Sequence, residues 1–522
     1  MASVLGVEAP PPRFNFAAHL LARNAVRPEK LAYVDDQRQL SYGALARRVR
    51  QVAGGLADLG LARGDRMLLA LEDCVDWPAL FLGALHAGVV PVAVSTILQP
   101  DEYAFLLADS GATLVATSTA QLPELSAALD RGEHCVRHVV TADASRGLND
   151  FLGSATPATT AADTHRDDVA FWLYSSGSTG RPKGTLHTHA NPYWTAELYG
   201  RSVLGIHESD VVFSASKMFF AYGLGNSLSF PLSVGATAVL TARRPTPEVV
   251  AARLVERRPT IFCGAPTGYA ALLAAPCLPA RHETALRLCS SAGEALPAEL
   301  GRRVATHFGV EIVDGLGSTE MLHIFVSNRP GDVRYGTTGV PVPGYEVALR
   351  DEAGRDVSGG EIGDLWVRGP SAACGYWQNP ERTEATFRDG WVKTGDKYSL
   401  GADGRYLYAG RGDDMIKVSG LYVSPFEVEA TLTEHPGVLE AAVVGVADDD
   451  GLIKPRAFVV LRPGRNGDAA FCAALQAFVK ERLAPYKYPR SIEIVAELPK
   501  TATGKIQRFR LREQANRSRA CP

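Results

Sequence analysis

The amino-acid sequence predicts an α/β protein with three parts: a large N-terminal domain of stacked α/β sheets, a β-rich subdomain within it, and a small mobile α+β C-terminal domain. Three observations support this fold class. Strand and helix patterns alternate from about residue 66, glycine-punctuated hairpins follow between residues 346 and 408, and a second α+β pattern begins after residue 412. The 522 residues suffice for three or four folding units.

The first half of the chain alternates short β-branched runs with helical patterns. This order and spacing are typical of parallel sheets covered by helices. We expect strands at residues 66–71, 89–94, 236–241 and 260–263, and helices at residues 77–87 and 247–257.

The sequence pattern changes twice in the second half of the chain. Runs at residues 364–367 and 405–407, separated by glycines, predict antiparallel strands. After the polar segment 410–414 we expect helices at 425–433 and 469–483, and strands at 440–446, 456–461 and 491–495. We therefore divide the chain into domains 1–412 and 413–522, since about 110 residues can form an independent unit.

Composition excludes several classes of function. The chain has 54 basic and 57 acidic residues, a net charge of −3, and therefore no electrostatic signature of a nucleic-acid or anionic-membrane partner. Its 8 cysteines include no C-x-x-C pair, which disfavours a disulfide framework or a structural zinc site.

Residues 1–16 lack the pattern of a signal peptide, and the longest apolar stretch, 79–95, is too short and broken to span a bilayer. We expect a cytoplasmic protein.

The segment 174–184 (YSSGSTGRPKG) is the most informative part of the chain. It follows the apolar run 169–173, so we interpret it as a loop leaving a buried strand. Glycines, hydroxyls and one lysine converge there in a pattern that suits a polyphosphate. The alternative is a surface loop rich in small residues. The predicted ATP-binding residues here are Ser175, Ser176, Gly177, Ser178, Thr179, Gly180 and Lys183.

This segment resembles the phosphate-binding signature of the adenylate-forming superfamily, which includes acyl-CoA synthetases, peptide-synthetase adenylation domains and luciferases. Four further segments resemble the motifs of that family in the expected order: 315–320 (GLGSTE), 394–396 (TGD), 410–429, and 499–505 (PKTATGK). The resemblance thus extends from residue 174 to residue 505. It implies an enzyme that activates a carboxylate with ATP and transfers the acyl group to coenzyme A.

The resemblance also implies residue roles. Thr319 would bind the α-phosphate, and Glu320 would hold Mg²⁺, which prefers oxygen ligands. Lys505 would be the catalytic lysine, offsetting the repulsion between carboxylate and α-phosphate. Asp396 and Arg411 would bind the ribose, and the adenine would lie between two segments that carry Gly293, Glu294, Asp314 and Gly315. Taken singly, each acidic residue could be a helix cap, and Lys505 a surface lysine.

Segment 217–225 (KMFFAYGLG) matches the part of the family that lines the acyl pocket. Ala221 stands where amino-acid-activating members carry an aspartate, and Gly317 stands where acetate-activating members carry a tryptophan. Both favour a hydrophobic acid larger than acetate. The amino-acid sequences of this segment and of 319–325 (TEMLHIF) resemble those of benzoate–CoA ligases. The expected pocket residues are Phe220, Ala221, Tyr222, Gly223, Gly317, His323 and Ile324, with core packing as the alternative.

Asp413 matches the family's hinge, and a face presented to coenzyme A would include Lys417, Ser419, Gly420 and Leu421. The predicted reaction converts benzoate, ATP and coenzyme A to benzoyl-CoA, AMP and diphosphate. The alternatives are a ligase for 2-aminobenzoate or a hydroxybenzoate, an aryl-acid adenylating enzyme that loads a carrier protein, and a nucleotide-binding protein with a decayed site. A homodimer and a lysine acetyltransferase acting on Lys505 are the macromolecular partners considered.

Overall fold

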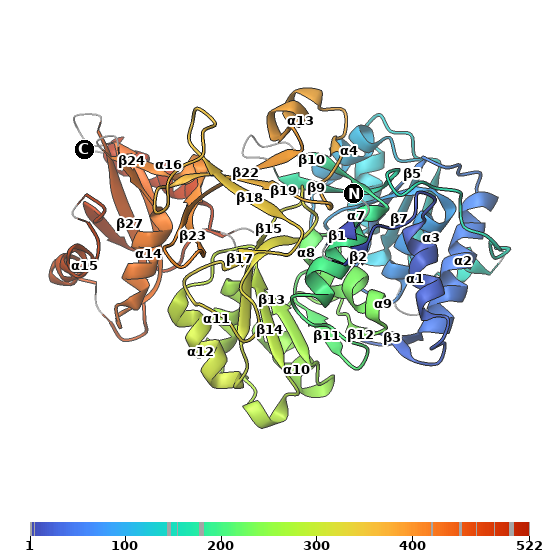
Figure 1. The fold of residues 1–522 in the computed structure, drawn as a ribbon, viewed down its shortest axis with the longest axis horizontal. Coiled ribbons are helices and arrows are strands. Elements are labelled where there is room, and N and C mark those ends of the chain that lie inside the picture. The colour runs from blue at the N-terminus through green and yellow to red at the C-terminus, as the bar shows by residue number, and fades with distance from the viewer. Residues whose placement is uncertain are drawn as a thin grey trace.

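The structure, a computed structural model, describes residues 3–4, 6–142, 148–153, 155–176, 182–418, 421–447, 452–465, 467–484, 486–500 and 506–520. The fold consists of two large sheets, a smaller antiparallel sheet and a C-terminal α/β unit (Figure 1). Within the described residues, no helix is both long enough and apolar enough to cross a bilayer.

The first large sheet is parallel at its centre and antiparallel at one edge. The strand order is β20-β10-β9-β6-β5-β7-β8. The parallel strands are β5 (Arg66–Ala70), β6 (Val90–Ala93), β7 (Leu114–Ser118), β8 (His138–Ala142) and β9 (Val169–Ser176). The antiparallel edge consists of β10 (Pro182–Thr188) and β20 (Gly375–Tyr376).

The second large sheet has the order β17-β16-β15-β14-β13-β11-β12-β3-β4. Its parallel strands are β3 (Leu31–Val34), β11 (Val211–Ser214), β12 (Thr237–Val239), β13 (Ile261–Gly264), β14 (Leu288–Ala292) and β15 (Ile312–Gly317). Antiparallel strands close both edges: β4 (Gln39–Ser41), β16 (Ile324–Ser327) and β17 (Val340–Pro341).

Helices fill the space between the two sheets and cover their outer faces. On β5, Met67 and Leu69 join the core between the sheets, while Leu68 and Ala70 face the other side, as the two-residue period of a strand requires. The inner layer contains α1 (Phe16–Asn24), α2 (Tyr42–Asp58), α3 (Asp76–Ala87), α7 (Ala190–Thr195) and the helical segment α8 (Ala221–Leu224) to α9 (Phe230–Val234).

The outer layers differ between the two sheets. Helices α4 (Pro100–Ser110) and α5 (Leu122–Leu129) cover the first sheet. Helices α10 (Pro247–Glu256), α11 (Pro266–Ala274) and α12 (Ala298–Phe308) cover the second, at the bottom of Figure 1. The short helix α6 (Asn149–Leu152) packs against α2 in the core between the sheets, and β1 (Ser3–Val4) pairs with β2 (Val7–Glu8) in a sheet of their own.

The β-rich subdomain is an antiparallel sheet of β18 (Glu346–Arg350), β19 (Gly363–Arg368), β21 (Phe387–Arg388), β22 (Trp391–Leu400) and β23 (Tyr406–Arg411). Helix α13 (Pro380–Thr386) precedes β21. The apolar side chains Leu365, Val367 and Tyr398 pack in one cluster with residues of the second large sheet. This packing places β22 and β23 against the second large sheet.

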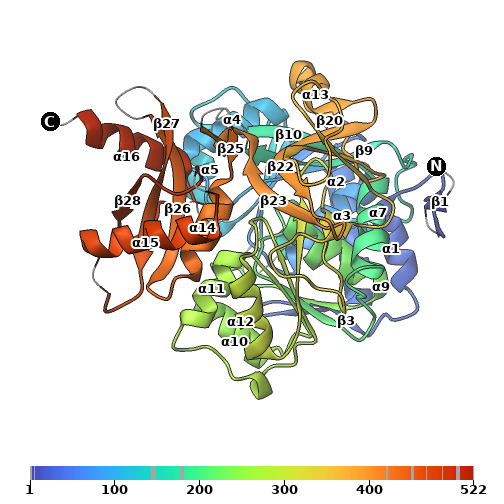
Figure 2. The same ribbon diagram turned by 60° about the vertical axis from the view of Figure 1, so that its left-hand side comes forward.

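The C-terminal unit has its own core. Strands β26 (Val438–Ala447), β27 (Ile453–Leu461) and β28 (Ser491–Ile494) form a sheet, preceded by the hairpin β24 (Ile416–Val418) and β25 (Leu421–Val423). Helices α14 (Pro425–Glu434) and α15 (Ala469–Arg482) cover one face of the sheet, and α16 (Arg508–Ala520) covers the other (Figure 2).

The predicted fold class is confirmed. Each strand and helix expected above is present, with ends that differ by a few residues at most. The domain boundary after residue 412 remains a prediction.

The carboxylate of Glu429 holds three elements of the C-terminal unit together. It is buried and accepts hydrogen bonds from the Val443 amide at 2.7 Å and from Arg508 Nη2 at 2.7 and 2.8 Å. Removing one partner of such a buried pair is costly, and Arg508 would keep only the more distant carboxylate of Asp414, at 3.9 Å. We expect Glu429→Gln to lower the unfolding free energy of this unit by about 3 kcal/mol.

Hydrogen exchange of the β26 amides, measured by mass spectrometry, would detect this loss. Glu434→Gln, on the exposed side of the same helix, should leave exchange unchanged. Equal exchange in both variants would contradict the structural role given to Glu429.

Candidate active site

The segment expected to bind phosphate connects two antiparallel strands. Strand β9 continues to Ser176 and β10 already begins at Pro182, with Ser175 paired to Lys183. The prediction of one loop over 174–184 is therefore wrong, because both of its ends are strands of the first sheet. Four predicted residues, Gly177, Ser178, Thr179 and Gly180, lie outside the described residues, and Ser176 is described in its backbone alone.

Lys183 points from β10 toward the segment that follows β15. Its Nζ donates to the Tyr376 hydroxyl at 3.1 Å and lies 3.8 Å from Oε1 of Glu320. The Tyr376 hydroxyl donates to the same Glu320 oxygen at 2.8 Å. Burial lowers the pKa of Lys183, and the Glu320 carboxylate opposes that shift. Three segments far apart in sequence thus meet at one carboxylate.

Tyr376 was missed by the sequence reasoning. It lies on the short strand β20, which pairs with β10, so the hydroxyl reaches Lys183 and Glu320 through sheet pairing. The only local signal is the dipeptide Gly375-Tyr376 with a left-handed glycine, φ +144°. That signal does not point to a ligand site.

His187 supports the backbone of the same segment. Its Nε2 lies 2.9 Å from the Thr319 carbonyl oxygen, and its Nδ1 lies 3.1 Å from Oδ1 of Asn191. Asn191 is itself oriented, because its Oδ1 accepts from the Thr188 amide at 2.9 Å. Full burial lowers the pKa of His187 to about 4. The histidine therefore holds the backbone of the Thr319–Glu320 turn against β10.

The turn that carries Thr319 and Glu320 is tightly bonded. The Leu322 amide donates to the Thr319 carbonyl at 3.0 Å, and Leu322 adopts the left-handed conformation, φ +64°. The carbonyl of Glu320 accepts from the Ala373 amide at 2.8 Å. These bonds leave the Glu320 side chain directed toward Lys183 and Tyr376.

Asp396 and Arg411 face each other across β22 and β23. Arg411 Nη1 donates to Asp396 Oδ1 at 2.9 Å and to the Thr394 carbonyl at 3.3 Å. The carboxylate raises the pKa of the guanidinium. Gly395 has φ +78°, and a Cβ there would lie 3.0 Å from Arg411 Nη2, so this position in β22 favours glycine. The two residues predicted to bind ribose are thus neighbours.

The predicted adenine-side residues lie at the ends of β14 and β15. Gly293 leaves β14 with φ +91°, and Oε2 of Glu294 accepts from the amide and hydroxyl of Thr267, at 3.2 and 2.5 Å. Asp314 is paired in register with Ser291, and Gly315 packs against Ile324. The structure therefore brings these four residues together near the carboxyl end of β14, inside the second sheet.

Asp314 has an unusual carboxyl group. The residue is 5% exposed, and its Oδ1 accepts no hydrogen bond from a described residue. Burial raises its pKa to about 8. A buried polar atom without a partner near the carboxyl end of a parallel strand fits a site that binds a hydrogen-bond donor.

The candidate acyl-pocket residues come from two segments. Tyr222 donates to or accepts from Ser290 Oγ at 2.9 Å, and its carbonyl oxygen lies 3.3 Å from His323 Nε2. His323 packs edge-on against Phe230, with ring centroids 4.5 Å apart, and burial lowers its pKa to about 3. Ile324 follows on β16 and packs in the same core cluster.

Phe220 and Ala221 face a different part of the core. They pack against the cluster that contains α3, whereas Tyr222 packs with Ile324. The structure thus brings Tyr222, His323 and Ile324 together and directs Phe220 elsewhere.

Three glycines set how closely the segments of this pocket approach. A Cβ on Gly223 would lie 2.0 Å from the Lys217 carbonyl oxygen, and one on Gly317 would lie 2.8 Å from the backbone of His323. A Cβ on Gly225 would lie 2.3 Å from Cδ2 of His323. Gly317 is therefore required by backbone packing, in addition to any effect on the size of a pocket.

The predicted hinge and CoA-face residues lie beyond β23. Asp413 belongs to a short turn, Gly412–Asp414, and the following Asp414 pairs with Arg512 at 3.0 Å. Lys417 and Leu421 belong to the hairpin β24–β25, described in their backbone alone. Ser419, Gly420 and the predicted catalytic Lys505 lie outside the described residues.

Among the described residues, no group of three or more His, Cys, Asp and Glu side chains is placed to hold a metal ion. A Mg²⁺ ion that bridges phosphates needs fewer protein ligands, often one or two carboxylates. Glu320 fits that requirement.

The model of the AMP-binding enzyme family matches residues 20–377, and that of the AMP-binding enzyme C-terminal domain matches residues 427–505. A benzoate–CoA ligase of Thauera aromatica is 54% identical over 96% of both chains. A 4-hydroxybenzoate–CoA/benzoate–CoA ligase of Rhodopseudomonas palustris is 47% identical over 96% of this chain and 94% of its own. The crystal structure of a benzoate CoA ligase from Burkholderia xenovorans superposes with a TM-score of 0.90, at 55% identity, covering 96% and 100% of the two chains.

The raised pKa of Asp314 makes stability depend on pH. The unfolded carboxyl ionises near pH 4, but the folded one keeps its proton to about pH 8, so folding becomes less favourable as pH rises between these values. Asp314→Asn removes this titration. The stability of the variant relative to wild type should therefore rise from pH 5 to 8 and then level off.

Urea denaturation at pH 5, 6, 7 and 8 would measure this difference. Asp130→Asn, at an exposed position, serves as control and should give a curve parallel to wild type. A parallel curve for Asp314→Asn would mean that Asp314 is ionised in the folded protein across this range.

Proposed function

The chain belongs to the AMP-binding enzyme family, and we propose that it is a benzoate–CoA ligase, which converts benzoate, ATP and coenzyme A to benzoyl-CoA, AMP and diphosphate through a benzoyl-adenylate. The observation that carries this proposal is the high identity, over nearly the full length, to ligases named for benzoate. The cluster of Tyr222, His323 and Ile324 is consistent with it, because aromatic and apolar side chains of this kind suit an aromatic ring.

In this proposal the residues around Glu320 receive the triphosphate. Lys183 lies between Tyr376 and Glu320, where its charge would meet the phosphate oxygens. Glu320 would hold Mg²⁺, which neutralises charge on the phosphates and orients them. His187 would keep Thr319 in place through its backbone carbonyl, so that the Thr319 hydroxyl can bind the α-phosphate.

The nucleoside would lie along the ends of β14, β15 and β22. Asp396 would accept hydrogen bonds from the ribose hydroxyls, and Arg411 already orients its carboxylate. Asp314 would accept a hydrogen bond from the exocyclic amine of adenine, which would satisfy its buried Oδ1.

The C-terminal unit would act in both half-reactions. Lys505 would bridge carboxylate and α-phosphate during adenylation, and the face with Lys417, Ser419, Gly420 and Leu421 would then turn toward the adenylate carbonyl. One domain cannot present both faces at once, so rotation about Asp413 would separate the two steps. Acetylation of Lys505 would remove its charge and stop the first step.

A panel of carboxylic acids tests the proposed function directly. Diphosphate release and loss of free coenzyme A thiol should both be fastest with benzoate. Faster turnover of linear medium-chain acids would contradict the aromatic assignment. Acid-dependent diphosphate release without loss of thiol would indicate instead an adenylating enzyme that loads a carrier protein.

The role of Lys505 is tested by separating the half-reactions. Lys505→Ala should lower adenylation about a hundred- to thousandfold, as expected when one electrostatic stabiliser of a transition state is lost. Thioester formation from supplied benzoyl-adenylate should survive. Lys480→Ala, at an exposed position of α15, is the matched control. Equal loss of both half-reactions would argue against the role.

The shape of the acyl pocket is tested at Gly317 and Ala221. A methyl group at Gly317 would push the backbone of His323, and overpacking of this kind costs about 1–3 kcal/mol. Gly317→Ala should therefore lower kcat/KM for benzoate roughly ten- to hundredfold, with little change in ATP binding. Ala221→Leu should have a milder effect of the same kind, because Ala221 adjoins Tyr222 in the chain but packs with the cluster that contains α3.

Gly268→Ala is the control for this pair. A Cβ at Gly268, on α11, meets no atom within 4 Å, so the same substitution should be silent there. An unchanged kcat/KM for benzoate in Gly317→Ala would refute the placement of the pocket beside His323.

A further inference from the structure

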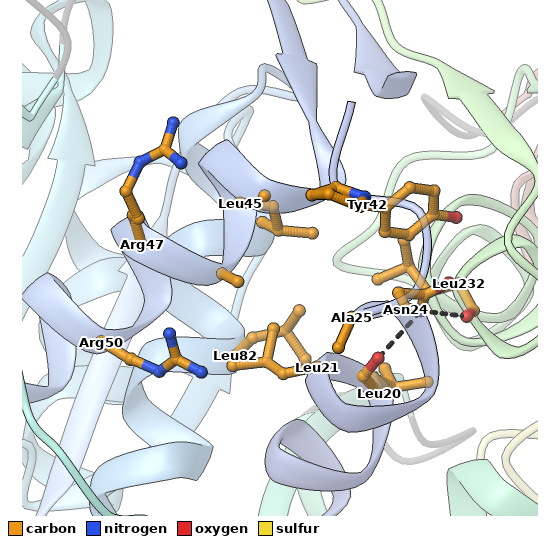
Figure 3. A pocket seen from close by; sticks show the side chains of 13 residues that line it. Leu20, Leu21, Asn24, Ala25, Tyr42, Leu45, Arg47, Arg50, Leu82 and Leu232 are labelled. Carbon is orange, nitrogen blue, oxygen red and sulfur yellow. Dashed lines mark hydrogen bonds between the residues drawn. The ribbon is translucent and has the colours of Figure 1, made fainter. Parts of the chain in front are cut away.

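A cavity of about 240 Å³ lies between α1 and α2, and none of the residues that line it is a candidate site residue (Figure 3). Its apolar walls include five leucines from four helices: Leu20, Leu21, Leu45, Leu82 and Leu232. An apolar cavity of roughly 150 Å³ can hold a benzene molecule. This one therefore has room for a single aromatic ring with a substituent.

The polar side chains inside the cavity are already bonded. Asn24 Nδ2 donates to the carbonyls of Leu20 and Leu232, both at 2.8 Å, and its Oδ1 accepts from Arg27 at 2.8 Å. The Tyr42 hydroxyl donates to the Ala236 carbonyl at 2.6 Å. The interior therefore suits an apolar group.

The rim of the cavity is cationic. Arg47 and Arg50 lie one turn apart on α2, on the same side of the cavity, and both are exposed (Figure 3). Across the part of the chain that is described, no carboxylate pairs with either guanidinium. The nearby Asp76 is engaged by Arg38 and Arg48. Two guanidinium groups are thus available to an anion at the mouth of an apolar cavity.

We propose that this cavity binds a small monocarboxylate, with its apolar body among the leucines and its carboxylate on Arg47 and Arg50. Arginine is suited to this role because its planar guanidinium can donate two parallel hydrogen bonds to a carboxylate. Single-ring aromatic acids and short-chain fatty acids share this chemistry. The site goes beyond the proposed ligase reaction and does not rest on it.

The cavity is connected to the candidate acyl pocket by one helical segment. Residues Ala221–Leu224, Gly225–Ser229 and Phe230–Val234 form consecutive helical turns without a break. Tyr222 at one end belongs to the candidate acyl pocket, and Leu232 at the other lines the cavity. A ligand in the cavity thus contacts the same rigid element that carries the pocket residue.

The binding test uses the full chain with its acyl pocket filled by a non-hydrolysable benzoyl-adenylate analogue. Radiolabelled benzoate and hexanoate are then measured separately by equilibrium dialysis. We expect one remaining site per chain for at least one of the two acids. Arg47→Gln/Arg50→Gln should weaken this binding at least tenfold, whereas Arg302→Gln/Arg303→Gln, which removes two exposed guanidinium groups from α12, should not.

The location of the site is tested in crystals soaked with 4-bromobenzoate or 6-bromohexanoate. Anomalous bromine signal among the five leucines supports the proposal, and the two probes show which acid is preferred. Absence of the second site at millimolar ligand overturns it. The proposal is also overturned if Arg47→Gln/Arg50→Gln changes the oligomeric mass without changing the binding of either acid. That result would mean that this face of α2 joins two copies of the chain. Failure of the benzoyl-adenylate analogue to bind would count against the proposed ligase reaction and not against the cavity site. Wild-type protein would in that case bind benzoate at the cavity alone.

Discussion

The contact between β10 and the turn after β15 is the constraint on which the candidate site depends. Lys183 and His187 are four residues apart on one strand, so both side chains leave the same face of the first sheet. One meets the carboxylate of Glu320 and the other the carbonyl of Thr319, both on the second sheet's side. Because helices pack between the two sheets, this polar contact helps to fix where the residues proposed to bind the phosphates lie relative to those proposed to bind the nucleoside.

Burial explains why this contact can be precise. His187 is fully enclosed, so its lowered pKa keeps the ring neutral at pH 7, and its single N–H can donate to the Thr319 carbonyl or to Asn191 Oδ1 but not to both. Asn191 is oriented by the Thr188 amide and the carbonyls of Pro370 and Ala372, which leaves its Oδ1 facing the histidine. Each member of the network is therefore held by partners from other elements, and a shift of one strand would break several bonds together.

The layered fold could be predicted from the sequence because its signals are local. The apolar runs of β5 and β13, and the helical pattern of α10, each fall within a dozen residues. The roles of Tyr376 and His187 could not be predicted, because each depends on a neighbour more than 50 residues away, reached through strand pairing or sheet packing. The loop expected at 174–184 was wrong for a related reason: residues 174–176 and 182–184 belong to strands, since β10 pairs with both β9 and β20.

The candidate acyl pocket illustrates a limit of judging size from side chains alone. Gly317 suggests open space when only its missing side chain is considered, but its Cα faces the backbone of His323 at a distance that admits no methyl group. Gly223 and Gly225 are similarly confined, by Lys217 and by His323. The wall is therefore built from close backbone approach, with His323 held between Phe230 and Tyr222. A wall of packed backbone deforms less readily than a wall of flexible side chains. Discrimination between ring substituents in such a pocket would therefore come mainly from steric fit.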